Sequence, residues 1–425
     1  MVTNPLTKNI DLKRGPLDIA AYEAADGYQS IHAIAKGLSP EDVLQRVKDS
    51  GLKGRGGAGF PTGLKWSFVP VDDGAPGEKY LVVNADEMEP GTFKDRLLME
   101  GDPHSLLEGM IIAAYTIQAN KAYIFLRGEY FASEQALQQA IKEAYNKGYL
   151  GTNIKGTDYN LDIVLHTSAG RYICGEETAL LNALEGKRAT PRAKPPFPQV
   201  SGLWGKPTIV NNVETLCNLP GIISYGVDWY KGLTRGKDHG TKLFGVSGKV
   251  KNPGCWELPL GTPIRELLED KAGGMQEGLE LKGFLPGGGS TDFMLPVHLD
   301  LALDYDEIAG AGSRLATGTM IVLDDKTCPV GMIGNLMKFF AHESCGWCTP
   351  CRDGLPWVEE IFNSLEIGRG TARELRILHE HVDYMGPGRT FCALAPGAMA
   401  PLGSGLKHFK DDFDIHVKKA CCPYK

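Results

Sequence analysis

The stretch Tyr80-Leu-Val-Val-Asn84 decides the fold, because it is the first of three short apolar runs that alternate with segments of helical periodicity. Alternation of this kind is typical of parallel strands joined by helical crossovers. It predicts an α/β region with a parallel sheet and helices on its faces over about residues 80–225. The later members of the series are a helix near 103–118, Ala122-Tyr-Ile-Phe-Leu126, a helix near 131–147, Leu161-Asp-Ile-Val-Leu165 and a helix from about residue 176.

The pattern changes twice after this region. Short strands with one helix follow and end on Gly318-Thr-Met-Ile-Val-Leu323, which indicates a small α+β domain. From about residue 329 the 3.6-residue period returns and predicts several helices. We expect domains at 1–240, 241–327 and 328–425, and we expect the first forty residues to wrap irregularly around the outside.

Length and charge narrow the class of protein. A chain of 425 residues is too long for one core and predicts two or three domains. The formal net charge of -7 argues against nucleic-acid binding, because the protein would repel a phosphate backbone. No apolar run is long enough to span a membrane, and the first residues lack the hydrophobic core of a signal peptide. We therefore expect a reducing cytoplasm, where ten scattered cysteines stay as thiols.

Four of these cysteines form a ligand set. Cys345-Gly-Trp-Cys348-Thr-Pro-Cys351 places three thiols on a tight loop ahead of a helix, and Cys392 adds a fourth from a distant segment. Four thiolates complete the ligand set of one iron-sulfur cluster, and the spacing of the fourth differs from that of a ferredoxin. The pattern predicts a single 4Fe-4S cluster, with Thr349-Pro350 keeping the third cysteine out of regular structure. A structural zinc site or buried unliganded cysteines are the alternatives.

The remaining cysteines carry weaker signals. Cys174 has no neighbouring thiol or histidine base and is interpreted as a small buried hydrophobe. His342, just before the cluster motif, is interpreted as a packed or solvated neighbour. The vicinal pair Cys421-Cys422 is interpreted as part of a mobile tail.

A glycine-rich stretch precedes the predicted sheet. Gly51-Leu-Lys-Gly-Arg-Gly-Gly-Ala-Gly59 follows a predicted helix at 40–48, so the strand required by a dinucleotide-binding fingerprint is missing. Its glycines permit positive φ and a backbone nest for an anion, with countercharge from Arg55 and Lys65. Aromatic faces for a flavin or adenine come from the nearby Phe60, Trp66 and Phe68. A flexible surface loop is the alternative.

Three further segments carry polar side chains. Asn84-Ala-Asp-Glu-Met-Glu89 leaves a predicted strand with carboxylates and an amide suited to ribityl or ribose hydroxyls. Glu176 and Glu177 open a predicted helix, where the helix dipole alone would favour them. Asn211-Asn-Val-Glu-Thr215 lies at a strand-to-helix junction and suits a phosphate, or an ordinary helix cap.

Together these motifs resemble the NADH- and FMN-binding flavoprotein subunits of bacterial NADH:quinone oxidoreductase, respiratory complex I, and the resemblance covers nearly the whole chain. It implies a Rossmann-like FMN domain, a β-grasp middle domain and a C-terminal helical bundle with one 4Fe-4S cluster. The implied FMN contacts are Gly54, Gly56, Lys65, Asn84, Asp86, Gly175, Glu176, Val210, Asn211, Asn212 and Thr215. The implied NADH contacts are Phe60, Phe68, Glu87, Glu89, Glu177, Lys194 and Phe197, with Glu177 positioning NADH.

The resemblance also implies a reaction and an assembly. Hydride would pass from NADH to FMN, and single electrons would then pass through the cluster to partner subunits and finally to quinone. The implied partners are a thioredoxin-like 2Fe-2S subunit and a large multi-cluster iron-sulfur subunit, on the cytoplasmic side of the inner membrane. A diaphorase subunit of an NAD-linked hydrogenase or formate dehydrogenase is one alternative, and a zinc-stabilised interaction scaffold is another.

Overall fold

The computed structural model describes residues 2–70 and 77–424. The chain divides into two compact units, which we call the first and the second unit. The first unit comprises the residues up to 88 together with 93–243 and 257–261, and the second comprises 89–92, 244–256 and 262 onward. The three domain boundaries expected from the sequence stay a prediction.

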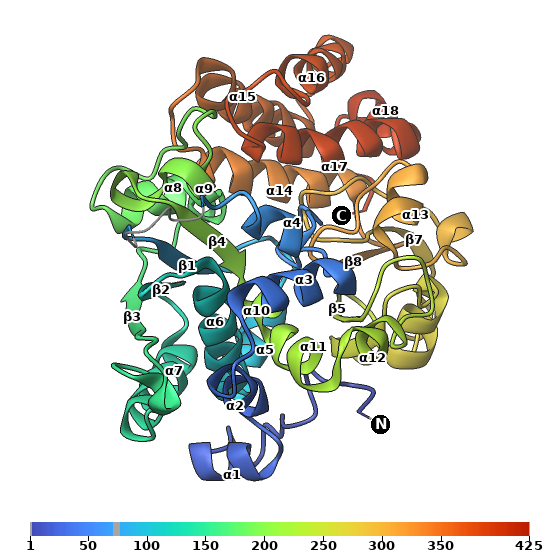
Figure 1. Cartoon of the computed structure of the whole chain (residues 1–425). Helices are drawn as coiled ribbons and strands as arrows, with labels where there is room; N and C mark the ends of the chain where they lie inside the picture. The colour runs from blue at the N-terminus through green and yellow to red at the C-terminus, as the bar shows by residue number, and fades with distance from the viewer. Residues whose placement is uncertain (1, 71–76, 425) are drawn as a thin grey trace. The chain divides into compact units, whose positions relative to one another are not determined.

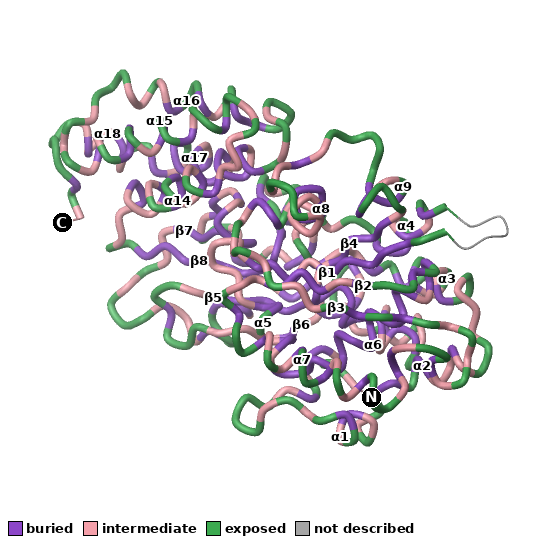
Figure 2. The backbone as a smooth tube through the Cα atoms, turned by 90° about the vertical axis from the view of Figure 1, so that its left-hand side faces the viewer, coloured by how far each residue is buried: buried purple, intermediate pink, exposed green. Residues whose placement is uncertain are grey.

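A four-stranded parallel sheet forms the centre of the first unit, as predicted (Figure 1). The strands lie in the order β3-β2-β1-β4, so β1 is central, and Figure 2 shows it buried. Tyr80 at the start of β1 pairs with Lys121 of β2 on one side and with Thr208 of β4 on the other. The strands are β1 (Tyr80–Ala85), β2 (Lys121–Leu126), β3 (Asp162–Thr167) and β4 (Thr208–Asn212).

Helices connect and cover these strands. The predicted helices are confirmed, and α6 is buried along almost its whole length beside β1 and β2. Gly109 of α6 permits this packing, because a Cβ there would lie 2.1 Å from the carbonyl oxygen of Leu216. The helices that matter for the site are α3 (Pro40–Ser50), α4 (Thr62–Trp66), α5 (Lys94–Gly101), α6 (Pro103–Ile117), α7 (Phe131–Asn146), α8 (Glu177–Leu184), α9 (Pro198–Ser201) and α10 (Val213–Cys217).

The prediction that the first forty residues wrap irregularly is wrong in part. Residues 2–18 contain only turns and bends, but α1 (Ile19–Ala24) and α2 (Gln29–Ala35) follow them. The physical reason is the carboxylate of Glu108, which is buried in α6 and accepts hydrogen bonds from Tyr22 Oη (2.7 Å) and Tyr28 N (2.8 Å). A buried carboxylate requires donors, and this segment provides them.

The second unit contains most of a mixed sheet with the strand order β6-β5-β8-β7. β5 and β8 are parallel, whereas β7 and β8 are antiparallel. This sheet agrees with the predicted small α+β domain. Its elements are β5 (Thr241–Ser247), β6 (Gly254–Pro259), β7 (Leu281–Leu285), β8 (Thr319–Asp324) and α13 (Tyr305–Gly310).

A series of α-helices follows the sheet in the second unit, as the 3.6-residue period predicted. The first two, α14 and α15, make the most extensive helix-to-helix contact and run in opposite directions (Figure 1). In the part of the chain that the structure describes, no helix has the length and apolarity needed to cross a membrane. The helices are α14 (Pro329–Glu343), α15 (Thr349–Glu366), α16 (Ala372–Met385), α17 (Leu394–His408) and α18 (Lys410–Lys419).

Candidate functional site

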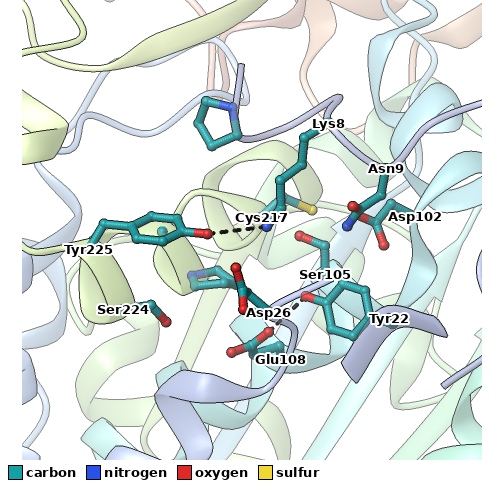
Figure 3. A pocket seen from close by; sticks show the side chains of 13 residues that line it. Lys8, Asn9, Tyr22, Asp26, Asp102, Ser105, Glu108, Cys217, Ser224 and Tyr225 are labelled. Carbon is teal, nitrogen blue, oxygen red and sulfur yellow. Dashed lines mark hydrogen bonds between the residues drawn. The ribbon is translucent and has the colours of Figure 1, made fainter. Parts of the chain in front are cut away.

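A small cavity in the first unit is not the site that the sequence predicts (Figure 3). It is lined by the N-terminal segment, α6 and α11 (Leu219–Tyr225), with Lys8, Asp102 and Cys217 among the lining residues. Its volume is about 20 Å³, which is enough for a water molecule and too little for a nucleotide. None of the lining residues belongs to the predicted contact sets.

The glycine-rich loop forms a closed turn over the junction of β4 and α10. Gly54 N donates to Phe60 O at 2.8 Å, and Gly57 and Gly59 have φ of 122° and 65°. A Cβ on Gly56 would lie 3.0 Å from Cβ of Asn212, so glycine is what allows this close approach. The backbone turn needed for an anion-binding nest is therefore present.

Arg55 does not provide countercharge at this loop, which corrects the sequence interpretation. Its guanidinium is fully buried and donates to Tyr230 Oη at 3.0 Å and to the carbonyl oxygens of His239 and Thr241. Its backbone N–H donates to Oγ1 of Thr215 at 2.8 Å. The Arg55 side chain therefore attaches the glycine-rich loop to the protein core, and Thr215 fixes the loop backbone.

The carboxyl edge of the sheet gathers predicted residues from three segments. Asn84 of β1 lies directly beside Asn212 of β4 in the register. The side-chain amide of Asn84 donates to Gly175 O at 3.0 Å, which connects β1 to the turn before α8. Asp86 is buried just beyond β1 and accepts a hydrogen bond from Ser168 Oγ at 3.2 Å. The parallel topology thus brings these groups to one edge.

Two predicted amides also serve the fold. Asn211 accepts a hydrogen bond from the indole N–H of Trp66 at 2.8 Å, which attaches α4 to β4. Asn212 caps α10 and donates its amide to Asp95 at 2.6 Å. The carbonyl of Val210 accepts from Lys65 at 2.9 Å. The helix-cap interpretation of this segment is therefore correct for Asn212.

Two lysines and two glutamates form an ion-pair cluster. Glu177 lies between Lys65 (2.8 Å) and Lys194 (2.9 Å), and Lys194 also approaches Glu176 at 3.2 Å. Burial would raise the pKa of Glu177, but the two lysines outweigh burial and lower it. Glu176 accepts from the first amides of α8, so its helix-terminus interpretation is correct. The cluster balances two positive charges with two negative ones.

The predicted aromatic contacts are exposed in the first unit. Phe60 and Phe68 are 46% and 49% exposed, and their rings lie 6.5 Å apart at a tilt of 46°. Phe197, which precedes α9, is 52% exposed. Exposed aromatic rings offer flat faces on which a planar ligand can stack.

The two remaining acidic residues, Glu87 and Glu89, each have hydrogen-bond partners of their own. The Glu87 carboxylate accepts from the amides of Lys94, Asp95 and Arg96 at 2.8–3.1 Å, so it holds the first turn of α5. Burial raises its pKa to about 7. Glu89 belongs to the second unit, where it accepts from Ser290 N at 2.7 Å.

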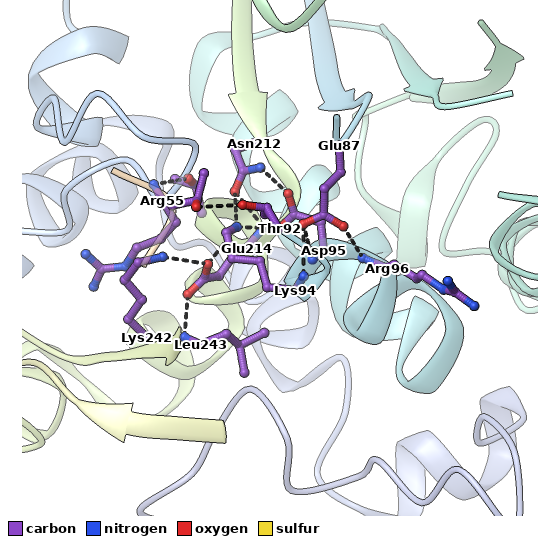
Figure 4. Close-up of polar contacts among 12 residues, drawn as sticks. Arg55, Glu87, Thr92, Lys94, Asp95, Arg96, Asn212, Glu214, Lys242 and Leu243 are labelled. Carbon is purple, nitrogen blue, oxygen red and sulfur yellow. Dashed lines mark hydrogen bonds and ion pairs between the residues drawn. The ribbon is translucent and has the colours of Figure 1, made fainter. Parts of the chain in front are cut away.

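Sequence reasoning missed a buried network of charges beneath the loop (Figure 4). Glu214 is fully buried and contacts Lys94 at 2.7 Å and Lys242 at 3.2 Å, and Lys94 also pairs with Asp95 at 2.6 Å. Burial would raise the pKa of Glu214, but the surrounding cations lower it to about 2. Burial lowers the pKa of Lys242 to about 8, with Lys94 and Arg55 adding to the effect. The one signal in the sequence was Glu214 within the Asn211–Thr215 motif.

The second unit brings the four predicted cysteines together. Cys351 is buried, and its pKa is raised to about 12 by burial and by the nearby thiols of Cys348, Cys392 and Cys345. Its sulfur also lies 3.1 Å from Oγ of Ser344. The donor set is four thiols, which fits an iron-sulfur cluster.

The local backbone at the cysteines differs from the prediction. Cys348 occupies the N-cap position of α15, and Thr349-Pro350 begins the helix instead of interrupting it, so Cys351 lies in its first turn. Proline is favoured at the start of a helix, because its missing N–H would have no partner there. Trp347 and Phe391 flank the site with rings 6.2 Å apart.

The interpretations of the remaining cysteines have different outcomes. Cys174 is buried, as predicted. The C-terminal tail is packed instead of mobile, because Cys422 is buried and Tyr424 Oη accepts from Lys282 at 2.6 Å. His342 has a largely exposed side chain, as expected for a solvated neighbour.

Comparisons with known proteins agree with this geometry. Three family models match: the Nuo51 FMN-binding domain at residues 47–221, the SLBB domain at 243–290 and the NADH-ubiquinone oxidoreductase-F iron-sulfur binding region at 331–416. The F subunit of NADH-quinone oxidoreductase from Escherichia coli (strain K12) is 54% identical over 417 residues, covering 98% of this chain and 94% of that protein. The corresponding protein of Mycobacterium tuberculosis is 48% identical over 410 residues, covering 96% and 92%.

A solved structure is also similar. It is the NAD+-reducing [NiFe]-hydrogenase in the H2-reduced state, with a TM-score of 0.79 and 34% identity. The match covers 94% of this chain and 64% of the hydrogenase chain, so this chain spans less than two thirds of that longer chain.

Proposed function

This chain belongs to the family of NADH-quinone oxidoreductase F subunits, and from its geometry we propose which residues perform the work of such a subunit. The chain is the NADH dehydrogenase flavoprotein subunit of respiratory complex I. When bound, FMN would supply the acceptor for a hydride from NADH, and the 4Fe-4S cluster would supply single-electron transfer toward quinone. The chain's own part is to position these groups, and no side chain has to act as an acid or base.

FMN is held at the carboxyl edge of the first sheet. The closed loop at Gly54–Gly59 supports this, because its backbone is fixed by Arg55 and Thr215 and its glycines let an anion approach closely. Open space beside Gly175 supports this position too. Apart from its two chain neighbours, no described residue has an atom within 4 Å of the point where a Cβ on Gly175 would lie. The proposed FMN contacts are Gly54, Gly56, Lys65, Asn84, Asp86, Gly175, Glu176, Val210, Asn211, Asn212 and Thr215.

NADH binds beside the ion-pair cluster, and the observation that carries this proposal is Glu177 held between Lys65 and Lys194. A carboxylate fixed from two sides cannot turn away, so it presents a defined acceptor to ribose hydroxyls. The exposed rings of Phe60, Phe68 and Phe197 offer stacking surface for adenine. Glu87 acts through α5, because its carboxylate is occupied there, and Glu89 stays a predicted contact.

The cluster is ligated by Cys345, Cys348, Cys351 and Cys392. The first turn of α15 contributes the positive end of a helix dipole to the thiolates of Cys348 and Cys351. The hydroxyl of Ser344 can donate to the Cys351 sulfur, and hydrogen bonds to sulfur tune the potential of a cluster.

The chain works with other subunits of complex I. We assign a thioredoxin-like 2Fe-2S subunit and a large multi-cluster iron-sulfur subunit as its direct partners, at the cytoplasmic face of the membrane. The 57% exposed Trp347 beside the cluster supports a docking face there. The likeness to the hydrogenase favours a diaphorase subunit as the second candidate. Purification from the native source separates the two, because either complex I subunits or hydrogenase subunits will accompany the chain.

The test of the proposed function is Cys392→Ser in the chain purified with its partners, with the exposed Cys421→Ser as the matched control. The EPR signal of this chain's own 4Fe-4S cluster should vanish from the reduced Cys392→Ser protein, while NADH still bleaches the flavin absorbance. Cys421→Ser should keep both signals. A normal cluster signal in Cys392→Ser would contradict the ligand assignment, and a protein without flavin absorbance would contradict the function.

A further inference from the structure

Four metal-ligating side chains meet in the second unit, away from the four cluster cysteines. Cys328, Glu366, His416 and Cys422 each place one ligand atom in a group whose members all lie within 4.8 Å of one another. His416 is fully buried and Cys422 nearly so. Of the vicinal pair Cys421-Cys422, only Cys422 belongs to this group, and Cys421 is exposed.

The distances among Cys328, Glu366 and His416 are close to the edges of a tetrahedral zinc site. Zn–S bonds are near 2.3 Å, and Zn–N and Zn–O bonds are near 2.0 Å. In a tetrahedron with these bonds, a sulfur ligand lies about 3.5 Å from a nitrogen or oxygen ligand, and a nitrogen ligand lies about 3.3 Å from an oxygen ligand. Cys328 Sγ lies 3.4 Å from His416 Nε2 and 3.8 Å from Glu366 Oε1, and the last two atoms lie 3.7 Å apart. Each separation agrees with the ideal edge to about half an ångström.

Two further contacts prepare these groups to bind a metal. His416 Nδ1 lies 2.6 Å from the carbonyl oxygen of Asp412. Because a carbonyl only accepts, Nδ1 must carry the proton, which leaves the lone pair of Nε2 facing the cluster. This is the usual orienting bond of a metal-bound histidine. Cys328 caps α14 and accepts from Gly331 N at 3.3 Å, which fixes the direction of its sulfur.

We propose that Cys328, Glu366, His416 and Cys422 bind a structural zinc ion. Two thiolates, an imidazole and a carboxylate are ligands that zinc accepts in tetrahedral geometry. All four positions are taken by protein, so the site has no open position for a substrate and is structural. This inference goes beyond the proposed function and does not depend on it.

The site joins three helices at the end opposite to the cluster. Cys328 precedes α14, Glu366 is the last residue of α15, and His416 lies in α18. The cluster cysteines Cys345 and Cys348 lie at the other end of the α14–α15 pair. The 15 residues of α14 span about 22 Å, so the two metal sites at its opposite ends are separate. Zinc would fasten the C-terminal segment to the helices that carry the cluster.

The experiment is metal analysis of the full chain, purified with a tag that lacks histidine and without added zinc. The wild-type chain should contain about one zinc in addition to the iron of its cluster. X-ray absorption at the zinc edge should give two sulfur ligands near 2.3 Å and nitrogen or oxygen ligands near 2.0 Å, which tests the site without any substitution.

Three variants separate this site from its surroundings. The double variant Cys328→Ser/Cys422→Ser should lose zinc and keep its iron, whereas Cys421→Ser should keep both. Cys392→Ser should lose iron and keep zinc. Absence of zinc from the wild-type chain, a ligand shell of four sulfurs, a Cys328–Cys422 disulfide, or zinc retained by the double variant would each overturn the proposal.

Discussion

Replacing Glu177 with Gln should relax the preference of the enzyme for NADH over NADPH. NADPH carries a 2′-phosphate with a charge of about −1.5 to −2, which a carboxylate in the ribose site repels. In the wild-type cluster, Lys65 and Lys194 balance Glu176 and Glu177. Glu177→Gln keeps the size and an acceptor but leaves one excess positive charge, so the variant should tolerate the phosphate.

The structure limits the size of this effect. Two unit charges about 4 Å apart interact with an energy of about 1 kcal/mol in water and about 4 kcal/mol near a protein surface. The side chain of Glu177 is 21% exposed, and two lysines within 2.9 Å already screen it. We therefore expect the lower part of this range, about 1–2 kcal/mol, which is a change of about 5-fold to 30-fold in the NADH to NADPH ratio of kcat/KM.

The assay is steady-state reduction of ferricyanide with each nucleotide at two salt concentrations. The wild-type penalty against NADPH should shrink with added salt, because ions screen the repulsion. Glu185→Gln is the matched control, since Glu185 follows the same helix α8 and pairs with Lys187 and Arg192 at 2.7 Å. An unchanged ratio in Glu177→Gln, or an equal change in Glu185→Gln, would refute the acidic ribose site.

Two further predictions concern the first unit. Glu214→Gln should destabilise the chain by about 3–5 kcal/mol, because Lys94 and Lys242 then remain buried without their shared carboxylate. Urea unfolding measures this loss of stability. An unchanged unfolding midpoint would mean that the network does not stabilise the site. Burial raises the pKa of Glu257 to about 7, so this group stabilises the folded state below its unfolded pKa and loses that contribution as the pH rises through 7. Glu257→Gln should therefore cost more stability at pH 5 than at pH 8, and a cost that grows with pH would contradict the raised pKa.

The sequence was sufficient wherever one short segment carries the whole signal. The apolar runs at Tyr80–Asn84 and Ala122–Leu126 predicted parallel strands, because strands buried on both faces must be apolar throughout. The helix at Pro40–Ser50 and the strand-to-helix junction at Asn211–Asn212 were likewise readable from periodicity and capping. The spacing of Cys345, Cys348 and Cys351 indicated a shared metal centre for the same reason.

Side-chain direction was not readable from the sequence. Arg55 stands among glycines that suit an anion, yet its guanidinium points into the core. Glu87 follows β1 as a ribose ligand would, yet α5 uses its carboxylate. In both cases the side chain bonds to groups that the packed structure brings to it, and the local sequence does not show those partners.

By itself, the sequence determined the parallel α/β sheet, the helical C-terminal part and the four-cysteine ligand set, since each depends on periodicity or on spacing along one segment. Only the tertiary structure decided that Glu177 lies between Lys65 and Lys194, and that Cys328 and Cys422 meet Glu366 and His416. These groups come from segments far apart in the chain. Their meeting is set by how helices pack, which no local pattern encodes.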